Sequence, residues 1–123
     1  MKTRLAVGVL VGLIGAVIIG GCGGPTVMAK YDAGVTQQKQ ENYLQAIESY
    51  REYIAEYPDS PMVPHALLRV ARCYVGLGDK PNAMATYEKI GEQFPTSEVA
   101  SWAEAEMRDV EKQDLVPDAP PEE

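Results

Sequence analysis

Residues 64–97, PHALLRVARCYVGLGDKPNAMATYEKIGEQFPTS, decide the fold. In their first half, apolar residues recur every three or four positions as far as Tyr74, which predicts a helix that stops at Gly76-Leu77-Gly78. Asp79 is a suitable N-cap for a second helix, and Pro95 closes it. The apolar stripe of that second helix consists of Ala83, Tyr87, Ile90 and Phe94.

Two flanking segments have the same helical spacing. The upstream helix has Asn42 as N-cap, with Gln45 three residues on, and ends at Pro58; Ser60-Pro61 then caps and opens the next helix. The upstream stripe consists of Tyr43, Ala46, Ile47, Tyr50, Ile54 and Tyr57. The downstream helix runs from about Ser97 to Lys112, with Val99, Trp102, Ala103, Met107 and Val110 on its apolar side.

These helices contain an internal repeat. At an offset of 37 residues, five positions are identical, and they are the small, aromatic and helix-ending ones that fix how helix pairs pack. The pairs are Ala46 and Ala83, Tyr50 and Tyr87, Pro58 and Pro95, Ser60 and Ser97, and Ala66 and Ala103. Helix pairs repeated at this length predict an all-α chain that forms a short α-solenoid.

The segment from Pro64 to Ser97 resembles a tetratricopeptide repeat. Its first helix has Leu67, Val70, Ala71 and Tyr74 at the signature positions, its turn has Gly78-Asp79, and its second helix has Ala83, Tyr87 and Pro95. The preceding unit, roughly 27–60, fits in its second helix and at Ala33-Gly34. The resemblance therefore implies about two helix pairs plus a closing helix. Such a short array leaves an apolar end at either terminus, so self-association is one way of completing the core.

The N-terminus has the three parts of a secretory signal peptide: positive Lys2 and Arg4, an apolar run from residue 5 to residue 19, and a small-residue exit. The exit, Ile19-Gly20-Gly21-Cys22, resembles the lipobox of bacterial lipoproteins. That resemblance implies cleavage before Cys22 and a diacylglyceryl group on its sulfur; apart from this covalent lipid, no cofactor is expected. An uncleaved membrane anchor is the alternative, but the run is short and contains three glycines.

The expected organisation is therefore a signal peptide at 1–21, the lipidated cysteine and tether at 22–28, the repeat domain at 29–112 and a disordered acidic tail at 113–123. The whole chain has 11 basic and 18 acidic residues. Removal of residues 1–21 changes the formal net charge from −7 to −9. This charge argues against nucleic acid as a partner, because phosphate contacts need clustered Lys and Arg.

No set of residues with the spacing of an active site is apparent. His65 is the single histidine, too few ligands are present for zinc, and no glycine-rich phosphate loop follows a strand. If Cys22 carries lipid, Cys73 has no partner for an internal disulfide, and we expect it to be a small buried side chain. The sequence thus predicts a non-enzymatic protein without a metal.

The resemblance also implies a concave ligand groove lined by the first helices of the repeats. Arg72 is expected to bind a carboxylate there, with Tyr31 and Leu68 as apolar anchors of a bound peptide. The alternative is that Arg69 and Arg72 only pair with nearby acids at the surface. The groove positions on this chain are Met28, Tyr31, Val35, Gln38, His65, Leu68, Arg72 and Val75.

The motifs that connect the helix pairs point to particular types of tetratricopeptide-repeat protein. Two stretches are similar to motifs of BamD-like outer-membrane lipoproteins and of the periplasmic YbgF/CpoB type: Tyr57-Pro58-Asp59-Ser60-Pro61 with Ala66 after it, and Phe94-Pro95-Thr96-Ser97 with Ala103 after it. The BamD-like type implies a lipid-anchored accessory of β-barrel assembly, and the YbgF/CpoB type a coordinator of envelope or peptidoglycan machinery. A periplasmic enzyme or carrier is a third possibility without supporting site chemistry. Gly23 directly after Cys22 favours an outer-membrane location facing the periplasm.

Overall fold

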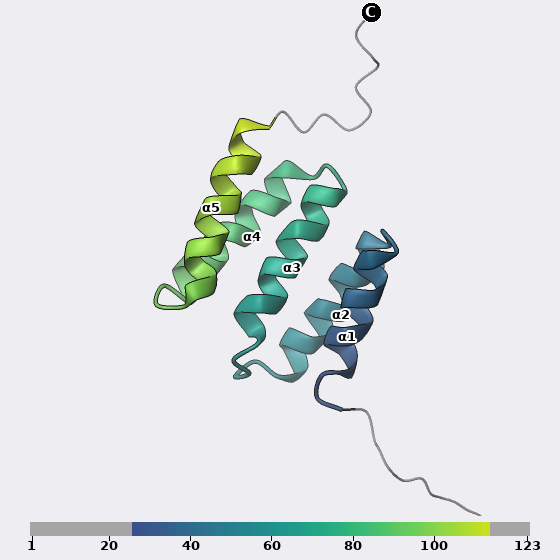
Figure 1. Ribbon diagram of the computed structural model, residues 1–123. Helices are drawn as coiled ribbons and strands as arrows, with labels where there is room; N and C mark the ends of the chain where they lie inside the picture. Colours follow the sequence, from purple (N-terminus) through teal and green to yellow (C-terminus); the bar gives the residue numbers. More distant parts are fainter. Residues whose placement is uncertain (1–25, 114–123) are drawn as a thin grey trace, which may run out of the picture.

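The computed structural model describes residues 26–113, and within this range the protein is entirely helical. Figure 1 shows two layers, with α1, α3 and α5 in front of α2 and α4. Each helix packs against its neighbour in sequence, and α5 also contacts α3, which is the arrangement of a short α-solenoid. The helices are α1 (Ala29–Lys39), α2 (Tyr43–Glu56), α3 (Val63–Gly76), α4 (Lys80–Gln93) and α5 (Glu98–Lys112).

Two of the predicted N-caps are confirmed. The Asp79 carboxylate accepts a hydrogen bond from the backbone N–H of Asn82 at 3.2 Å, and the Ser97 hydroxyl accepts one from Val99 at 3.2 Å. Each cap satisfies one of the backbone donors that the first turn of a helix leaves without a partner. The sequence therefore fixes where α4 and α5 begin.

The two other predicted caps differ in outcome: Asn42 is the N-cap residue of α2 but without a side-chain capping bond, and Ser60 is not the N-cap of α3. The side chain of Asn42 makes no capping hydrogen bond to α2 and donates instead to Gln40 at 3.4 Å. Helix α3 begins at Val63 rather than at Pro61, and Pro64 is the proline in its first turn. Ser60 bonds to the buried Tyr53 hydroxyl, 2.7 Å away, and its own hydroxyl accepts from the Met62 N–H. Tertiary contact with Tyr53 thus places Ser60 in the loop.

The internal repeat is visible in the core. Ala46 and Ala83 are both fully buried, and Tyr50 and Tyr87 occupy equivalent buried positions in α2 and α4. The 37-residue offset relates the two members of each pair. Small side chains at these positions let neighbouring helices approach closely, and the tyrosine rings fill the remaining volume.

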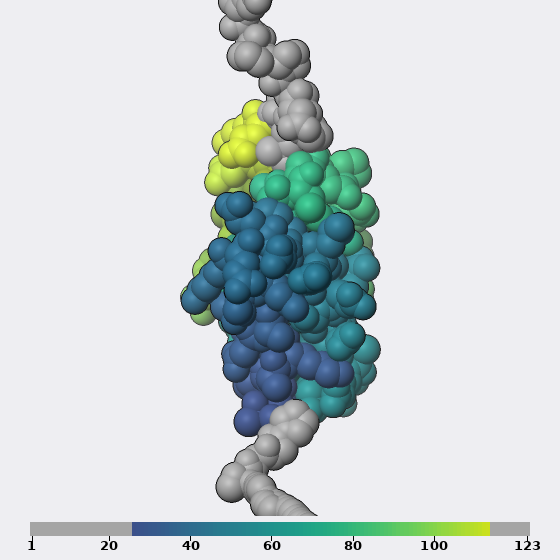
Figure 2. Space-filling view, turned by 90° about the vertical axis from the view of Figure 1, so that its right-hand side faces the viewer, coloured from purple at the N-terminus to yellow at the C-terminus, as the bar shows by residue number. Residues whose placement is uncertain are grey.

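A tyrosine cluster joins α1 to α2. Tyr31 makes edge-to-face contacts with Tyr50 and Tyr53, with ring centroids 5.4 and 5.7 Å apart. Gly34 lies directly over Tyr50, so close that an added Cβ would be 2.7 Å from the ring. Figure 2 shows α1 and α2 forming the end of the molecule, with α4 and α5 at opposite sides behind them. The packing of α1 on α2 at this end therefore depends on the contact between Gly34 and the ring of Tyr50.

The opposite end of the helical array is polar. The α5 positions that correspond to buried Leu67, Ala71 and Tyr74 of α3 are Glu104, Arg108 and Glu111, and all three are exposed. Charged side chains replace the stripe that a following helix would cover, which is typical of a capping helix. The expectation of an apolar end at both termini is therefore wrong at α5.

Two α5 residues differ from expectation in their burial. Trp102 is 41% exposed, and Met107 is only partly buried against the core. The true buried stripe consists of Val99, Ala100, Ala103 and Val110. Residues 1–25 and 114–123, with the predicted signal peptide, Cys22 and nearly all of the acidic tail, lie outside the described residues. Between residues 26 and 113, no helix combines the length and apolar character that a bilayer crossing requires.

Replacement of Gly34 with Ala tests the close contact with Tyr50. Because Tyr50 is fully buried and its ring cannot move into solvent, we expect a loss of about 1 to 3 kcal/mol in the free energy of unfolding. Gly91 in α4 is the matched control, since an added Cβ there meets nothing within 4 Å. Gly91→Ala should stabilise the protein by up to about 1 kcal/mol through helix propensity. Urea unfolding measures both; an equal effect of the two substitutions would contradict the contact.

The two turns within the helix pairs have the same backbone geometry but different residues. Gly78 has φ 73°, and the equivalent residue 37 positions earlier, Glu41, has φ 62°. The left-handed conformation costs an L-residue with a side chain roughly 1 to 2 kcal/mol, whereas glycine adopts it freely. The first turn is therefore strained, and the second is not.

Glu41→Gly should relieve this strain. We expect the free energy of unfolding to rise by about 0.5 to 1 kcal/mol, because part of the gain is offset by the greater freedom of glycine in the unfolded chain. The reciprocal substitution, Gly78→Ala, should lower it by about 1 kcal/mol. Thermal and urea unfolding measure both changes in stability. A Glu41→Gly variant that is less stable than the original protein would contradict strain at Glu41.

Candidate protein-binding face

The candidate binding surface is the face formed by α1, α3 and α5, named here the inner face. These three helices lie side by side in the front layer of Figure 1. All the groove positions expected from the sequence lie on or just before α1, or on α3. Their burial divides them into residues that support the face and residues that are available on it.

Tyr31 and Leu68 belong to the core. Tyr31 is 8% exposed and Leu68 is 3% exposed, and both are part of the single buried cluster. A side chain with so little free surface cannot hold a ligand without separation of the helices. The assignment of these two residues as apolar anchors therefore needs correction: they support the inner face from beneath.

Half-buried residues supply the accessible part of the inner face. Val35 and Val75 pack against the core but keep part of their surface free. Gln38 accepts a hydrogen bond from the hydroxyl of buried Tyr50 at 3.0 Å, so its carbonyl is already occupied. Met28 is also partly buried, with its sulfur 3.9 Å from the Tyr53 hydroxyl. Apolar contact on α1 and α3 is thus limited to a few aliphatic side chains.

Arg72 holds a carboxylate of its own chain. Its Nε donates to Glu106 Oε1 at 3.1 Å and to Oε2 at 3.0 Å, and Nη2 adds a third hydrogen bond. The hydroxyl of Tyr87 donates to Glu106 Oε2 at 3.1 Å. The hydrogen bonds from Arg72 to Glu106 raise the pKa of the arginine, and burial raises the pKa of Tyr87. Both donors therefore keep the protonation states that favour this network.

The network fastens α3, α4 and α5 to one another, and it changes what Arg72 can do. A ligand carboxylate would have to displace Glu106, which is already held by two side chains. Arg69, by contrast, forms no ion pair within the described part of the chain. Beside the network is a hollow of about 190 Å³ whose lining includes Val75, Asp109 and Val110. This hollow is the concave part of the inner face.

His65 and Trp102 form the other end of the inner face. Their rings meet edge to face with centroids 6.1 Å apart. Buried His65 Nδ1 has no hydrogen-bond partner among residues 26–113. From the sequence, Trp102 is a candidate for an interface anchor as well as for capping this end of the array, and the 37-residue offset applied to His65 leads directly to it. Its 41% exposure makes it a large accessible aromatic surface on this face.

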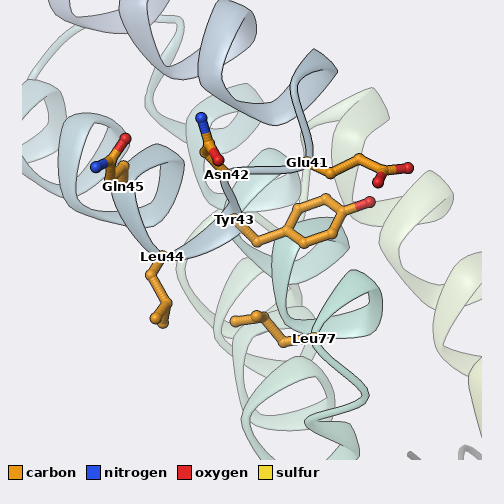
Figure 3. Close-up of a pocket in the computed structure, with 6 residues that line it drawn as sticks. All are labelled: Glu41, Asn42, Tyr43, Leu44, Gln45 and Leu77. Carbon is orange, nitrogen blue, oxygen red and sulfur yellow. The ribbon is translucent and has the colours of Figure 1, made fainter.

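A second hollow lies at the turn between α1 and α2. Figure 3 shows Tyr43, Leu44 and Leu77 arranged around it, with Leu44 at the start of α2 and Leu77 just after α3. Its volume is about 320 Å³, and Leu44 is 72% exposed. The hollow is separate from the inner face, so Leu44 provides a useful control position for tests of binding.

Residues 26–113 provide neither a cysteine nucleophile nor a metal centre. Cys73 is buried, and desolvation raises the pKa of its thiol to about 11, which removes the thiolate needed for a nucleophile. Among residues 26–113, no three His, Cys, Asp or Glu side chains converge as metal ligands do. What remains is a surface with aliphatic, aromatic and charged groups on rigid helices.

Comparison with known protein families agrees with this architecture. The tetratricopeptide repeat family matches residues 38–104, which is more than half of the chain, and the protein belongs to it. The match covers all of α2, α3 and α4, and the beginning of α5. Among curated proteins, none matches the chain. Tetratricopeptide repeats generally mediate protein–protein interactions, and the all-helical solenoid described above is the structure that does so.

The Arg72–Glu106 pair can be measured by a double-mutant cycle. Arg72→Met and Glu106→Gln each remove one charge, and the amide oxygen introduced by the second substitution can still accept the Tyr87 hydrogen bond. Because the pair has bidentate geometry but is partly exposed, we expect a coupling energy of about 0.5 to 1.5 kcal/mol. The coupling should fall at high salt. Strictly additive effects on urea unfolding would show that the pair contributes nothing to the packing of α5.

Proposed function

We propose that the protein is a non-enzymatic, lipid-anchored scaffold of the bacterial cell envelope that binds a protein partner on its inner face. Three observations support this proposal: the family of the repeats, the accessible Trp102 on α5, and the lipobox-like residues that end at Cys22. Family membership carries the greatest weight, because it makes protein binding the default role of the helical part.

The anchor follows from the chemistry of Cys22. Acyl chains on an N-terminal cysteine bind a bilayer with about 0.8 kcal/mol per buried methylene, so several chains hold a protein without a spanning helix. Residues 23–28 would then join the lipid to α1 as a short tether. The repeat domain would lie close to the membrane surface, with its partner brought to the same place.

We assign the partner to the β-barrel assembly machinery of the outer membrane. The basis is the resemblance of the two interhelical motifs, at 57–61 and 94–97, to BamD-like lipoproteins, together with Gly23 after the lipidated cysteine. A YbgF-like coordinator of peptidoglycan or envelope machinery shares the first feature but needs no anchor. The lipobox is what favours the BamD-like role.

On the inner face, a partner would contact aliphatic Val75 and aromatic Trp102 rather than Tyr31 or Leu68. Trp is the residue type that most often dominates binding energy at protein interfaces. Arg69, four residues after His65 on α3, supplies a positive charge that is not used in an ion pair within the described residues. A complementary partner segment is therefore apolar with an acidic residue.

Affinity purification from native membranes tests this function. The tagged full-length protein, solubilised in mild detergent, should recover the β-barrel assembly core. Trp102→Ala combined with Val75→Glu should reduce that recovery at least about tenfold, because loss of an interface aromatic costs on the order of 2 kcal/mol. Leu44→Ala is the matched control, since Leu44 is exposed outside the inner face, and it should leave recovery unchanged.

Cys22→Ser serves as the membrane-anchoring variant in the same experiment. It should abolish metabolic labelling by palmitate and leave a larger unprocessed precursor, because the acyl-accepting thiol is gone. Persistent labelling would reject the lipid anchor. Recovery of peptidoglycan or division proteins in place of the assembly core would replace the BamD-like role with the YbgF-like one.

A further inference from the structure

The face opposite the inner face has a groove between α2 and α4, named here the outer groove. Its floor is aliphatic and consists of Ile54 from α2 and of Leu67 and Val70 from α3. Its volume is about 200 Å³. Two basic side chains line it, Arg51 on α2 and Lys89 on α4, and no lining residue is acidic. In a chain with a formal net charge of −7, a groove with this composition is unusual.

Neither basic residue is neutralised by the rest of the described chain. Between residues 26 and 113, the ion pairs are Lys30 with Glu52 and Glu56, and Arg72 with Glu106. Arg51 donates a hydrogen bond to the Tyr74 hydroxyl and lies over its ring, with its Cζ 5.9 Å from the centroid. This contact orients the guanidinium, and no carboxylate among residues 26–113 lies within ion-pair distance of it, although Glu48 and Glu52 line an adjacent hollow. The groove thus suits an acidic segment with some apolar surface.

The chain itself contains a segment of that chemistry. Residues 114–123, DLVPDAPPEE, include four carboxylates and no basic residue, with Leu115, Val116 and three prolines between them. The segment lies outside the described residues. Its prolines favour extended backbone, which exposes side chains along a groove and loses little entropy on binding. Charge and apolar content therefore match the outer groove.

The end of α5, after which the segment follows in the sequence, is held at the start of α4. Lys80, the first residue of α4, donates from Nζ to the carbonyls of Glu111 and Gln113 at 3.1 and 3.2 Å. Lys89 lies nine residues further along α4, a distance of roughly 13 Å. Ten extended residues span up to about 33 Å. The segment is long enough to cross α4 and place its last carboxylates between α2 and α4.

We infer that residues 114–123 bind in the outer groove of their own molecule, with carboxylates on Arg51 and Lys89 and apolar atoms over the α3 floor. The interaction is independent of the inner face and of the lipid anchor, so the proposed function can fail without affecting it.

Disulfide trapping in the full-length protein tests the inference. Exposed Ala55 lines the outer groove, and Ala119 lies within the segment. The Ala55→Cys/Ala119→Cys variant should form an intramolecular disulfide about tenfold faster than Ala105→Cys/Ala119→Cys, in which the first cysteine is exposed on α5 outside the groove. Non-reducing gels follow the reaction, and buried Cys73 does not compete because its pKa is raised.

Charge reversal supplies the second half of the test. Arg51→Glu with Lys89→Glu should remove the rate advantage, and so should 1 M salt, where the screening length is about 3 Å. Lys39→Glu with Arg108→Glu changes the net charge equally at exposed positions outside the groove and should preserve the advantage. Far-UV circular dichroism confirms that each variant is folded.

Three outcomes would overturn the inference. Equal rates for the two cysteine pairs would show that the segment has no preference for the groove. Disulfide-linked dimers in place of the intramolecular product would assign the groove to a second copy. A rate advantage that survives reversal of both Arg51 and Lys89 would show that charge does not hold the segment there.

Discussion

The buried tyrosines of α2 and α4 are the constraint on which the helical array depends. Tyr50 is fully buried beneath Gly34 and Tyr31, and its hydroxyl needs an acceptor because an unpaired polar atom in the core costs about 1 to 3 kcal/mol. It donates to Gln38 on α1. The hydroxyl of Tyr87, which is also buried, donates to Glu106 on α5. Each tyrosine therefore fastens an inner-face helix to the layer behind it.

The Tyr50 hydroxyl donates to the preceding helix and the Tyr87 hydroxyl to the following one, because the available acceptors differ. The position equivalent to Gln38 in the second unit is Val75, which has no acceptor, so Tyr87 cannot copy the first arrangement. The position equivalent to Glu106 in the preceding helix is Arg69, which can only donate. The two rings thus occupy equivalent positions, but their hydroxyls have different partners. Because Tyr87 bonds to Glu106, which also accepts from Arg72, α3, α4 and α5 are joined in one network.

The inner face and the outer groove differ in the charged side chains that they leave available. On the inner face, Arg72 is used internally, and accessible binding surface is left at Val75 and Trp102. On the outer groove, Arg51 and Lys89 remain without carboxylate partners within residues 26–113. The family resemblance suggested Arg72 as the ligand-binding charge, but Arg72 is paired with Glu106. The basic side chains without a carboxylate partner therefore lie mainly in the outer groove.

The sequence alone determined the helices, the repeat and the tetratricopeptide fold, because apolar spacing, prolines and the caps Asp79 and Ser97 act over a few residues. Tertiary structure decided what each side chain presents. Tyr31 and Leu68 were expected on a binding groove and are buried, while Trp102 was grouped with the apolar side of its helix and is 41% exposed. Neighbouring positions on one helix turn differ by about 100°, so only the contacts of packed helices decide which side becomes surface.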